Sequence, residues 1–275
     1  MAALPYASAL ILGVDDHVGA YLARLLDARG VRVEGVAAGV AGPDAIAELG
    51  IGAAVAMTDD PLRAAAGVDV VFAIPGAADS LDARIEAILA DARPGLRIAH
   101  VVDRDRLQRD RATADRARRI AEQRGAAGRP WFNAILHPHD SRLGPTDNLA
   151  ARVTAAAWRA SQGQPERLEL VETGPQDWGW TPEYVDAVLR LAALPQVRDA
   201  AIATGHTLTA AEFAHHAYDF FGQSAADHVT ILPGPAAATD TGVAAAALKA
   251  TTGWSASTWG RDLVRALGEG AAGRH

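Results

Sequence analysis

Residues 9–26 read ALILGVDDHVGAYLARLL, and this stretch decides the fold. The apolar run of residues 9–12 breaks at Gly13, and apolar residues at helical spacing follow it, which predicts a strand, a tight turn and a helix. Strands that alternate with helices predict an α/β fold, a Rossmann-like doubly wound parallel sheet with a small C-terminal lobe. Further strands are predicted from short apolar runs at residues 31–36, 68–74, 98–102, 131–136, 168–171 and 200–204.

Helical patterns follow most of these predicted strands, at residues 18–26, 149–160, 182–193, 210–221 and 259–267. The arginine-rich stretch 103–129 has few apolar residues and predicts a solvated helix, with a basic helix facing a phosphate as the alternative. We assign residues 1–140 to the Rossmann-like lobe and residues 269–275 to a disordered tail. Residues 141–268 are predicted to form a mixed region that completes the sheet and builds the substrate lobe.

The composition excludes several kinds of chemistry. The 275 residues include no cysteine, which excludes a disulfide scaffold and a cysteine nucleophile. Of the 26 lysines and arginines only Lys249 is a lysine, so no mechanism can use a lysine earlier in the chain. The net charge of −7 does not favour binding to nucleic acid, which is itself negatively charged. No apolar run reaches the ~20 residues of a membrane span. We therefore expect a cytoplasmic protein with a small-molecule substrate and with neither nucleic acid nor membrane as a partner.

The turn after the first predicted strand departs from a dinucleotide-binding loop. Such a loop places glycines at its first, fourth and seventh positions, so that backbone N–H groups approach a pyrophosphate at a helix N-terminus. Gly13 and Gly19 fit the first and seventh positions, but Asp16 brings a Cβ and a negative charge to the fourth. Residues 36–39 supply neither an acid nor an arginine for the ribose. We expect no dinucleotide or weak binding, the alternatives being an inherited turn without function and an altered cofactor site.

Three stretches carry a family resemblance: the turn and helix of residues 13–26, residues 133–141 and residues 177–187. The second reads NAILHPHDS, similar to a family N-G-I-L-F-N-H-E-S, and the third reads DWGWTPEYVDA. Lys249 and residues 253–254 are similar to a closing K-A…L-G-W. Together these stretches resemble the GDP-mannose 4,6-dehydratase branch of the extended short-chain dehydrogenase/reductase family, of which the chain looks like a degenerate member.

The resemblance implies a Rossmann lobe and a small C-terminal lobe with a nucleotide-sugar pocket between them, and association as a homodimer. It also implies NADP, if the family's site survives, and hydride transfer through a tyrosine followed four residues later by a lysine. No tyrosine of this chain has that lysine. Aligned with the family, Arg109 and Thr113 fall at the tyrosine and lysine, whereas Asp103 and Asp105 fall at a catalytic threonine and a glutamate.

Two groups of residues could carry other chemistry. Asp103 and Asp105 leave the central predicted strand at its carboxyl end, where a buried carboxylate with a raised pKa could act as general acid or base; salt bridges to neighbouring arginines are the alternative. His137 and His139 are two residues apart, so on a strand they would share a face as an acid/base pair, with a structural role as the alternative. No third metal ligand is evident.

Other candidate residues line up with the family's substrate lobe. Trp178 and Trp180 belong to a turn that shapes the sugar pocket in the family, with packing as the alternative. His100, inside a predicted strand, is expected to be a core histidine. The predicted substrate-binding residues are Arg109, Asp140, Asp177, Trp178 and Trp180.

These observations favour an acid/base enzyme of specialised metabolism that kept the fold but abandoned hydride transfer. It would be a lyase, cyclase or isomerase that acts on a small polar or sugar-like metabolite without net redox. One alternative is a non-catalytic partner subunit of an active relative. The other is an NADP-dependent nucleotide-sugar dehydratase or reductase with altered catalytic residues.

Overall fold

The computed structural model describes residues 4–39, 44–75, 79–235 and 241–273 and divides into two compact units. The first unit comprises Met1–Leu136 and Tyr184–Ile202, and the second comprises His137–Glu183 and Ala203–His275. The first unit therefore ends at residue 136 rather than at residue 140, and one later segment of the chain returns to it. No helix among the described residues is long and apolar enough to span a membrane.

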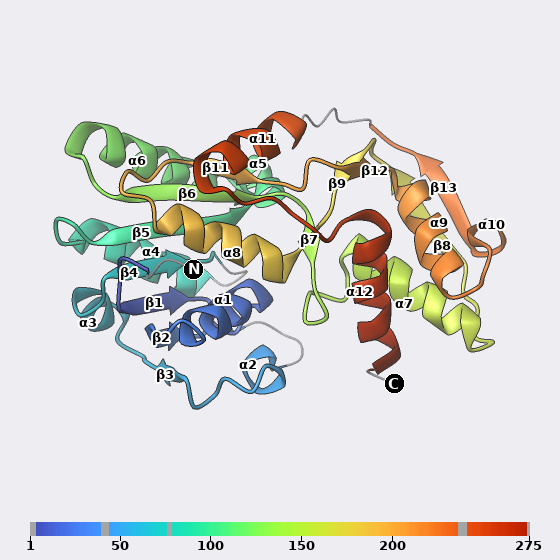
Figure 1. The fold of residues 1–275 in the computed structure, drawn as a ribbon, viewed down its shortest axis with the longest axis horizontal. Helices are drawn as coiled ribbons and strands as arrows, with labels where there is room; N and C mark the ends of the chain where they lie inside the picture. Colours follow the sequence, from blue (N-terminus) through green and yellow to red (C-terminus); the bar gives the residue numbers. More distant parts are fainter. Residues whose placement is uncertain (1–3, 40–43, 76–78, 236–240, 274–275) are drawn as a thin grey trace. The chain divides into compact units, whose positions relative to one another are not determined.

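The first unit is built on a seven-stranded parallel sheet, which confirms the predicted α/β fold class (Figure 1). The strand order places β1 beside β4, with two strands on one side of this pair and three on the other, as in doubly wound dinucleotide-binding folds. Ligands of such folds bind outside the carboxyl ends of the strands, at the point where the order reverses. Across the sheet the strands are β11 (Ala200–Ile202), β6 (Trp131–Leu136), β5 (Arg97–Asp103), β4 (Val70–Ala73), β1 (Ser8–Leu12), β2 (Arg32–Val36) and β3 (Val55–Met57).

Helices cover both faces of this sheet (Figure 1). Apolar side chains of α4 and α6, such as Ile85 and Ile120, pack with Leu10 of the central strand in one buried cluster. The predicted helical stretch 103–129 is two helices that meet at Asp110, whose carboxylate accepts hydrogen bonds from the first amides of the second helix. The helices are α1 (His17–Asp27), α2 (Ala45–Glu48), α3 (Pro61–Ala66), α4 (Asp79–Asp91), α5 (Arg104–Arg109), α6 (Arg111–Ala127) and α8 (Thr181–Ala192).

The second unit packs helices around a smaller core, with three two-stranded sheets. Phe213 and Leu263 are among its fully buried residues. Its helices are α7 (Leu149–Ser161), α9 (Ala210–Phe220), α10 (Ala225–His228), α11 (Thr241–Thr252) and α12 (Gly260–Gly273). Its strand pairs are β7 (His139–Asp140) with β10 (Gly179–Trp180), β9 (Gln176–Asp177) with β12 (Thr207–Leu208), and β8 (Leu168–Glu172) with β13 (Val229–Pro233).

The end of α12 corrects the predicted disordered tail. The helix continues to Gly273, and Ala271 is only 4% exposed. Leu263, Leu267 and Ala271 recur at helical spacing, so one face of the helix stays packed through the segment that the sequence predicted to be disordered. Residues 274–275 of that prediction lie outside the described residues.

Candidate functional site

The turn after β1 packs too tightly for side chains at two of its glycines. Gly13 has a φ of +87°, and a Cβ on it would lie 2.8 Å from the carbonyl oxygen of Ile74, which follows β4. A Cβ on Gly19 would lie 2.1 Å from the carbonyl oxygen of Gly13. Both glycines are therefore required to bring α1 and the ends of β1 and β4 together.

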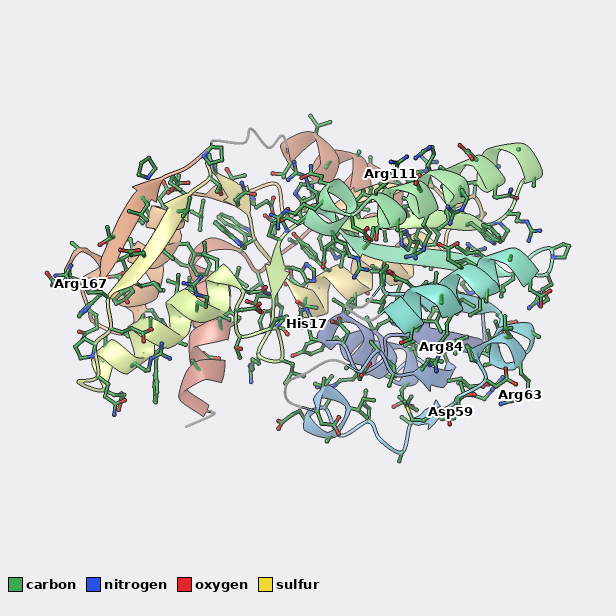
Figure 2. The ribbon with its side chains drawn as sticks, turned by 180° about the vertical axis from the view of Figure 1, so that it is seen from behind. His17, Asp59, Arg63, Arg84, Arg111 and Arg167 are labelled. Atoms are coloured by element: carbon green, nitrogen blue, oxygen red, sulfur yellow. The ribbon has the colours of Figure 1, made fainter. Side chains whose placement is uncertain are left out.

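Two carboxylates bond the backbone at this corner. Asp16 is the N-cap of α1, and its side chain accepts a hydrogen bond from the Val18 amide at 2.8 Å. Asp15 reaches the end of β2, where it accepts from the Ala38 amide at 2.5 Å and the Gly39 amide at 2.8 Å. The next residue, His17, is buried at the start of α1 (Figure 2). The sequence identified Asp16, but the link from Asp15 to β2 was missed.

Three amides that could face a nicotinamide dinucleotide at this corner already have carboxylate partners. In the usual loop, amides at the start of the first helix face the pyrophosphate, and the end of the second strand holds the ribose. Here Asp16 already bonds the Val18 amide, and Asp15 places a second negative charge on the amides that follow β2. A pyrophosphate would have to displace one carboxylate and would be repelled by both.

The carboxylates of Asp103 and Asp105 are both exposed, whereas the acid/base hypothesis for these residues supposed a buried carboxylate. Asp103 is the last residue of β5, and its register partner on β6 is Leu136. Asp105 forms an ion pair with Arg109 at 3.1 Å, and the arginine side chain is 80% exposed. The predicted alternative of a salt bridge therefore holds for Asp105, because α5 places residues four apart on one face.

The two histidines after β6 do not share a strand face. β6 ends at Leu136, and β7 begins at His139 after an intervening proline. His137 is buried, and its carbonyl oxygen accepts a hydrogen bond from His139 Nδ1 at 2.9 Å. The proposed pairing of two imidazoles on one strand is thus wrong, because Pro138 interrupts the strand. No group of three or more potential metal ligands occurs among the described residues.

The two predicted aspartates of the second unit bond its backbone. Asp177 is fully buried and accepts hydrogen bonds from the Thr204 amide, the Thr204 hydroxyl and the Gly205 amide, at 3.0, 2.8 and 2.7 Å. Asp140 is also buried and accepts from the Ser141 amide at 2.8 Å. The Asp177 contacts join the end of β9 to the residues after β11, which is a structural role.

The two tryptophans of the predicted sugar pocket pack against the core of the second unit. The Trp178 ring lies 5.3 Å from that of Phe213 between centroids, at an angle of 54°. Trp180 is half-buried against the same cluster. Both placements favour the packing alternative.

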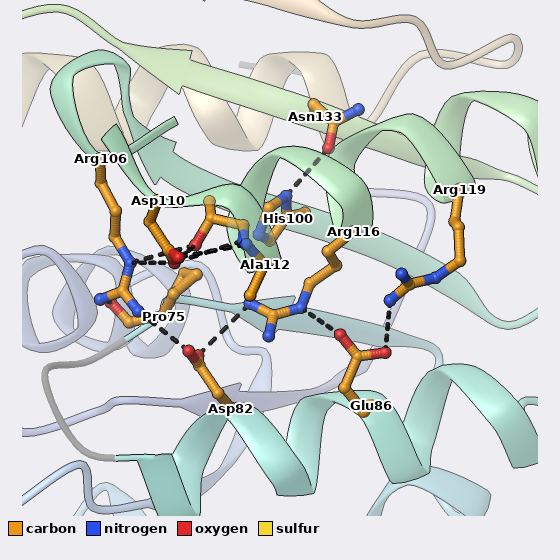
Figure 3. Close-up of polar contacts among 11 residues, drawn as sticks. Pro75, Asp82, Glu86, His100, Arg106, Asp110, Ala112, Arg116, Arg119 and Asn133 are labelled. Carbon is orange, nitrogen blue, oxygen red and sulfur yellow. Dashed lines mark hydrogen bonds and ion pairs between the residues drawn. The ribbon is translucent and has the colours of Figure 1, made fainter. Parts of the chain in front are cut away.

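A network of arginines and acids joins α4, α5 and α6 (Figure 3), and sequence reasoning missed it. Arg116 is almost fully buried and bonds Glu86 at 2.8 Å and Asp82 at 3.3 Å. Arg106 bonds Asp82 at 2.9 Å and donates to the carbonyl oxygen of Pro75 at 3.2 Å, so its guanidinium reaches the end of β4. The only sequence signal for these contacts is the dense alternation of arginines and acids.

His100 lies beneath α6 in the same region (Figure 3). Its Nδ1 is 2.9 Å from Asn133 Oδ1, and Asn133 Nδ2 donates to the carbonyl oxygen of Ala117. Burial, together with the charges of Arg116 and Arg106, lowers the pKa of His100 to about 4. The imidazole is therefore neutral at pH 7, and the prediction of a core histidine is consistent with these contacts.

The sheet order and the glycine turn define a protein of the Rossmann α/β class with a second, smaller unit. No protein-family model matches the chain. The fold is similar to that of a UDP-glucuronic acid 4-epimerase from Bacillus cereus, in complex with UDP-glucuronic acid and NAD, with a TM-score of 0.77 and 11% identity over 98% of this chain and 100% of that one.

Two further solved structures share the fold. A dTDP-glucose 4,6-dehydratase from Bacillus anthracis, in complex with NAD, has a TM-score of 0.74 and 11% identity over 96% of this chain and 95% of its own. RMD from Pseudomonas aeruginosa, complexed with NADPH, has a TM-score of 0.69 and 14% identity over 98% and 100%. These similarities confirm the expected Rossmann-like fold with a second, smaller unit.

Proposed function

We propose that this chain acts on a small polar or sugar-like metabolite by acid/base chemistry, without net hydride transfer. The observation that carries the proposal is the exposed carboxylate of Asp103 at the carboxyl end of β5. Parallel sheets of this kind bind ligands at that edge. Two of the solved structures of the same fold are a sugar-nucleotide epimerase and a sugar-nucleotide dehydratase, which supports a substrate of related polarity.

Asp103 would serve as the base or the acid of an elimination or an isomerisation. In an elimination, a base takes the proton from one carbon, and the electrons of the broken C–H bond form a double bond to the next carbon. The hydroxyl on that next carbon leaves as water with a proton from an acid. In an isomerisation, the proton is returned to a different carbon. His137, the first residue after β6, is the second group to which we assign a proton. Neither reaction needs a dinucleotide.

The test compares the wild-type protein with Asp103→Asn on a panel of nucleotide sugars that includes dTDP-glucose, UDP-glucuronic acid and GDP-mannose. Products are followed by NMR and mass spectrometry with no dinucleotide added. We expect turnover by the wild type and a loss of at least ~100-fold in Asp103→Asn, the low end for a missing acid or base. Asp91→Asn, exposed at the end of α4, is the matched control and should retain the activity. Turnover that requires added NAD or NADP would contradict the proposal.

The arginine network favours one alternative, a non-catalytic partner of an active relative. Arg106, Arg116 and the acids of α4 bond one another at the helices to which the alignment assigns the family's tyrosine and lysine. This alternative predicts no turnover of the panel and co-elution of the chain with an active dehydratase on size-exclusion chromatography. The same experiment, run on the chain alone, tests the expected homodimer.

A further inference from the structure

The corner between β1, α1 and the end of β2 carries its own anions. Three backbone amides there, those of Val18, Ala38 and Gly39, donate to the carboxylates of Asp15 and Asp16. We infer that these carboxylates close the dinucleotide-binding corner of the fold, so that the protein is stable without a nicotinamide dinucleotide and rejects one.

Asp16 supplies the first half of this closure. The amides of the first helical turn have no partner within the helix and carry its positive dipole end, which is why phosphates bind there in many proteins. The Asp16 carboxylate bonds the Val18 amide at 2.8 Å and neutralises this end of α1 from within the chain. A phosphate that approached would meet a negative charge in place of a free amide.

Asp15 supplies the second half and links two loops that are far apart in the sequence. Its two oxygens accept from the consecutive amides of Ala38 and Gly39, and Gly39 has a φ of +74°. Two successive amides that face one carboxylate form a concave anion-binding arrangement, which here is filled by the chain itself. The carboxylate thus spans the gap between the β1 turn and the β2 end that a dinucleotide crosses in this fold.

The backbone of the turn is closely packed at its two glycines. A Cβ on Gly19 would overlap the Gly13 carbonyl oxygen, and a Cβ on Gly13 would press on that of Ile74. A dinucleotide at this turn would have to compete with the two carboxylates for the amides that they already bond. This conclusion is independent of Asp103, so the inference and the proposed function fail or stand in separate experiments.

The test uses the full chain and thermal unfolding with NADH or NADPH at about 1 mM, a concentration at which a micromolar ligand would give a clear stabilisation. We expect no rise in the Tm of the wild type. Asp15→Ala should lower the Tm by about 3 °C or more, because two amides lose their acceptor. The control is Asp59→Ala, which alters an exposed carboxylate in the turn after β3 (Figure 2) and should shift the Tm by less than about 1 °C.

A second variant tests whether the two carboxylates exclude a dinucleotide or only stabilise the backbone of the two loops. Asp15→Ala combined with Asp16→Gly removes both anions and restores the glycine at the fourth position of the loop. It should gain a Tm rise with NADH or NADPH that the wild type lacks. Asp15→Asn keeps one acceptor oxygen, so its Tm should decrease less than that of Asp15→Ala. This comparison tests the Asp15 contacts even if the double variant does not fold. Three results would overturn the inference. The first is a Tm rise of the wild type with either dinucleotide. The second is a folded double variant whose Tm does not rise with NADH or NADPH, and the third is a Tm of Asp15→Ala equal to that of the Asp59→Ala control.

Discussion

At the scale of single residues, His100 shows how the surroundings set a protonation state. It is completely buried on β5, and it faces Asn133 of β6 together with Arg106 of α5, Arg116 of α6 and Glu86 of α4. Burial is the largest cause of its lowered pKa, and the two arginines add to it, whereas Asn133 and Glu86 act in the opposite direction. The folded protein therefore holds this imidazole neutral and uses its Nδ1–H as a donor.

The low pKa of His100, about 4, predicts a loss of stability in mild acid. The unfolded chain binds a proton at this histidine below about pH 6.5, whereas the folded protein does not until about pH 4, so the free energy of unfolding falls as the pH drops through that interval. The loss approaches about 3 kcal/mol at pH 4. His100→Gln keeps an N–H donor for Asn133 but cannot titrate, so urea unfolding across this range should show a shallower pH dependence. An unchanged dependence would contradict the assignment.

Where the structure differs from the sequence-based predictions, the difference lies in how buried a side chain is and in which residues it contacts. Asp103 and Asp105 do stand at the carboxyl end of a central strand, as predicted, but the strand ends early enough to leave both carboxylates exposed. Pro138 separates His137 from His139 and ends the strand between them, so the spacing of two residues does not place both side chains on one strand face. Contacts such as the hydrogen bond from the Gly39 amide to Asp15 join positions far apart in the sequence, and no local sequence pattern predicts them.

At the scale of elements, α6 docks through charge as well as through apolar contacts. Its buried face contains Thr113, Arg116, Ala117 and Ile120, and Arg116 is a large, fully buried side chain. A pattern that counts only apolar residues therefore predicts a solvated helix, although one face is packed. The acids that bond Arg116 come from α4, a helix that the sequence analysis does not predict although Leu81, Ile85 and Ile88 have helical spacing.

Replacing Arg116 tests this docking. Arg116→Met preserves much of the volume but removes the bonds to Asp82 and Glu86, and we expect a cost of about 1–3 kcal/mol. The cost stays moderate because Glu86 is partly solvated and keeps Arg119 at 2.6 Å. Arg118→Met is the matched control on the same helix. Its guanidinium is exposed and pairs with Asp115 of α6, so the effect should stay within about 0.5 kcal/mol. Equal effects in chemical unfolding would show that the buried pairs do not stabilise the docking.

Most of the predicted strands are present because parallel strands buried on both faces read as unbroken apolar runs. The short edge strand β3 was missed because two of its three residues are exposed. The last turns of α12 were missed for a different reason, since glycine and alanine there resemble a flexible tail until Ala271 is seen to be buried.

At the scale of the whole molecule, the first unit is discontinuous in the sequence. Residues 184–202 complete it with most of α8 and with β11, after the chain has passed through part of the second unit. Asp186 bonds Arg29 of the α1 loop at 2.6 Å, and Asp199 bonds the Asn133 amide at 2.7 Å and the Arg124 guanidinium. Burial opposes the charge on Asp199, but these donors more than offset it and lower its pKa. The sequence predicts that the region after residue 140 completes the sheet, but no local pattern shows that residues 184–202 are the segment that returns.

This discontinuity predicts which fragment folds. A fragment of residues 1–140 exposes the edge of β6 and lacks Tyr184, Val188 and Leu189, all fully buried, so we expect it to melt without cooperativity or to associate. Residues 1–136 joined by a short glycine-serine linker to residues 184–202 should melt cooperatively, because a crossover helix naturally returns from the end of one parallel strand to the start of the next. Circular dichroism melts and size-exclusion chromatography of both fragments decide the matter. Cooperative melting of the 1–140 fragment at the temperature of the joined one would show that the returning segment is an addition to the first unit rather than part of its core.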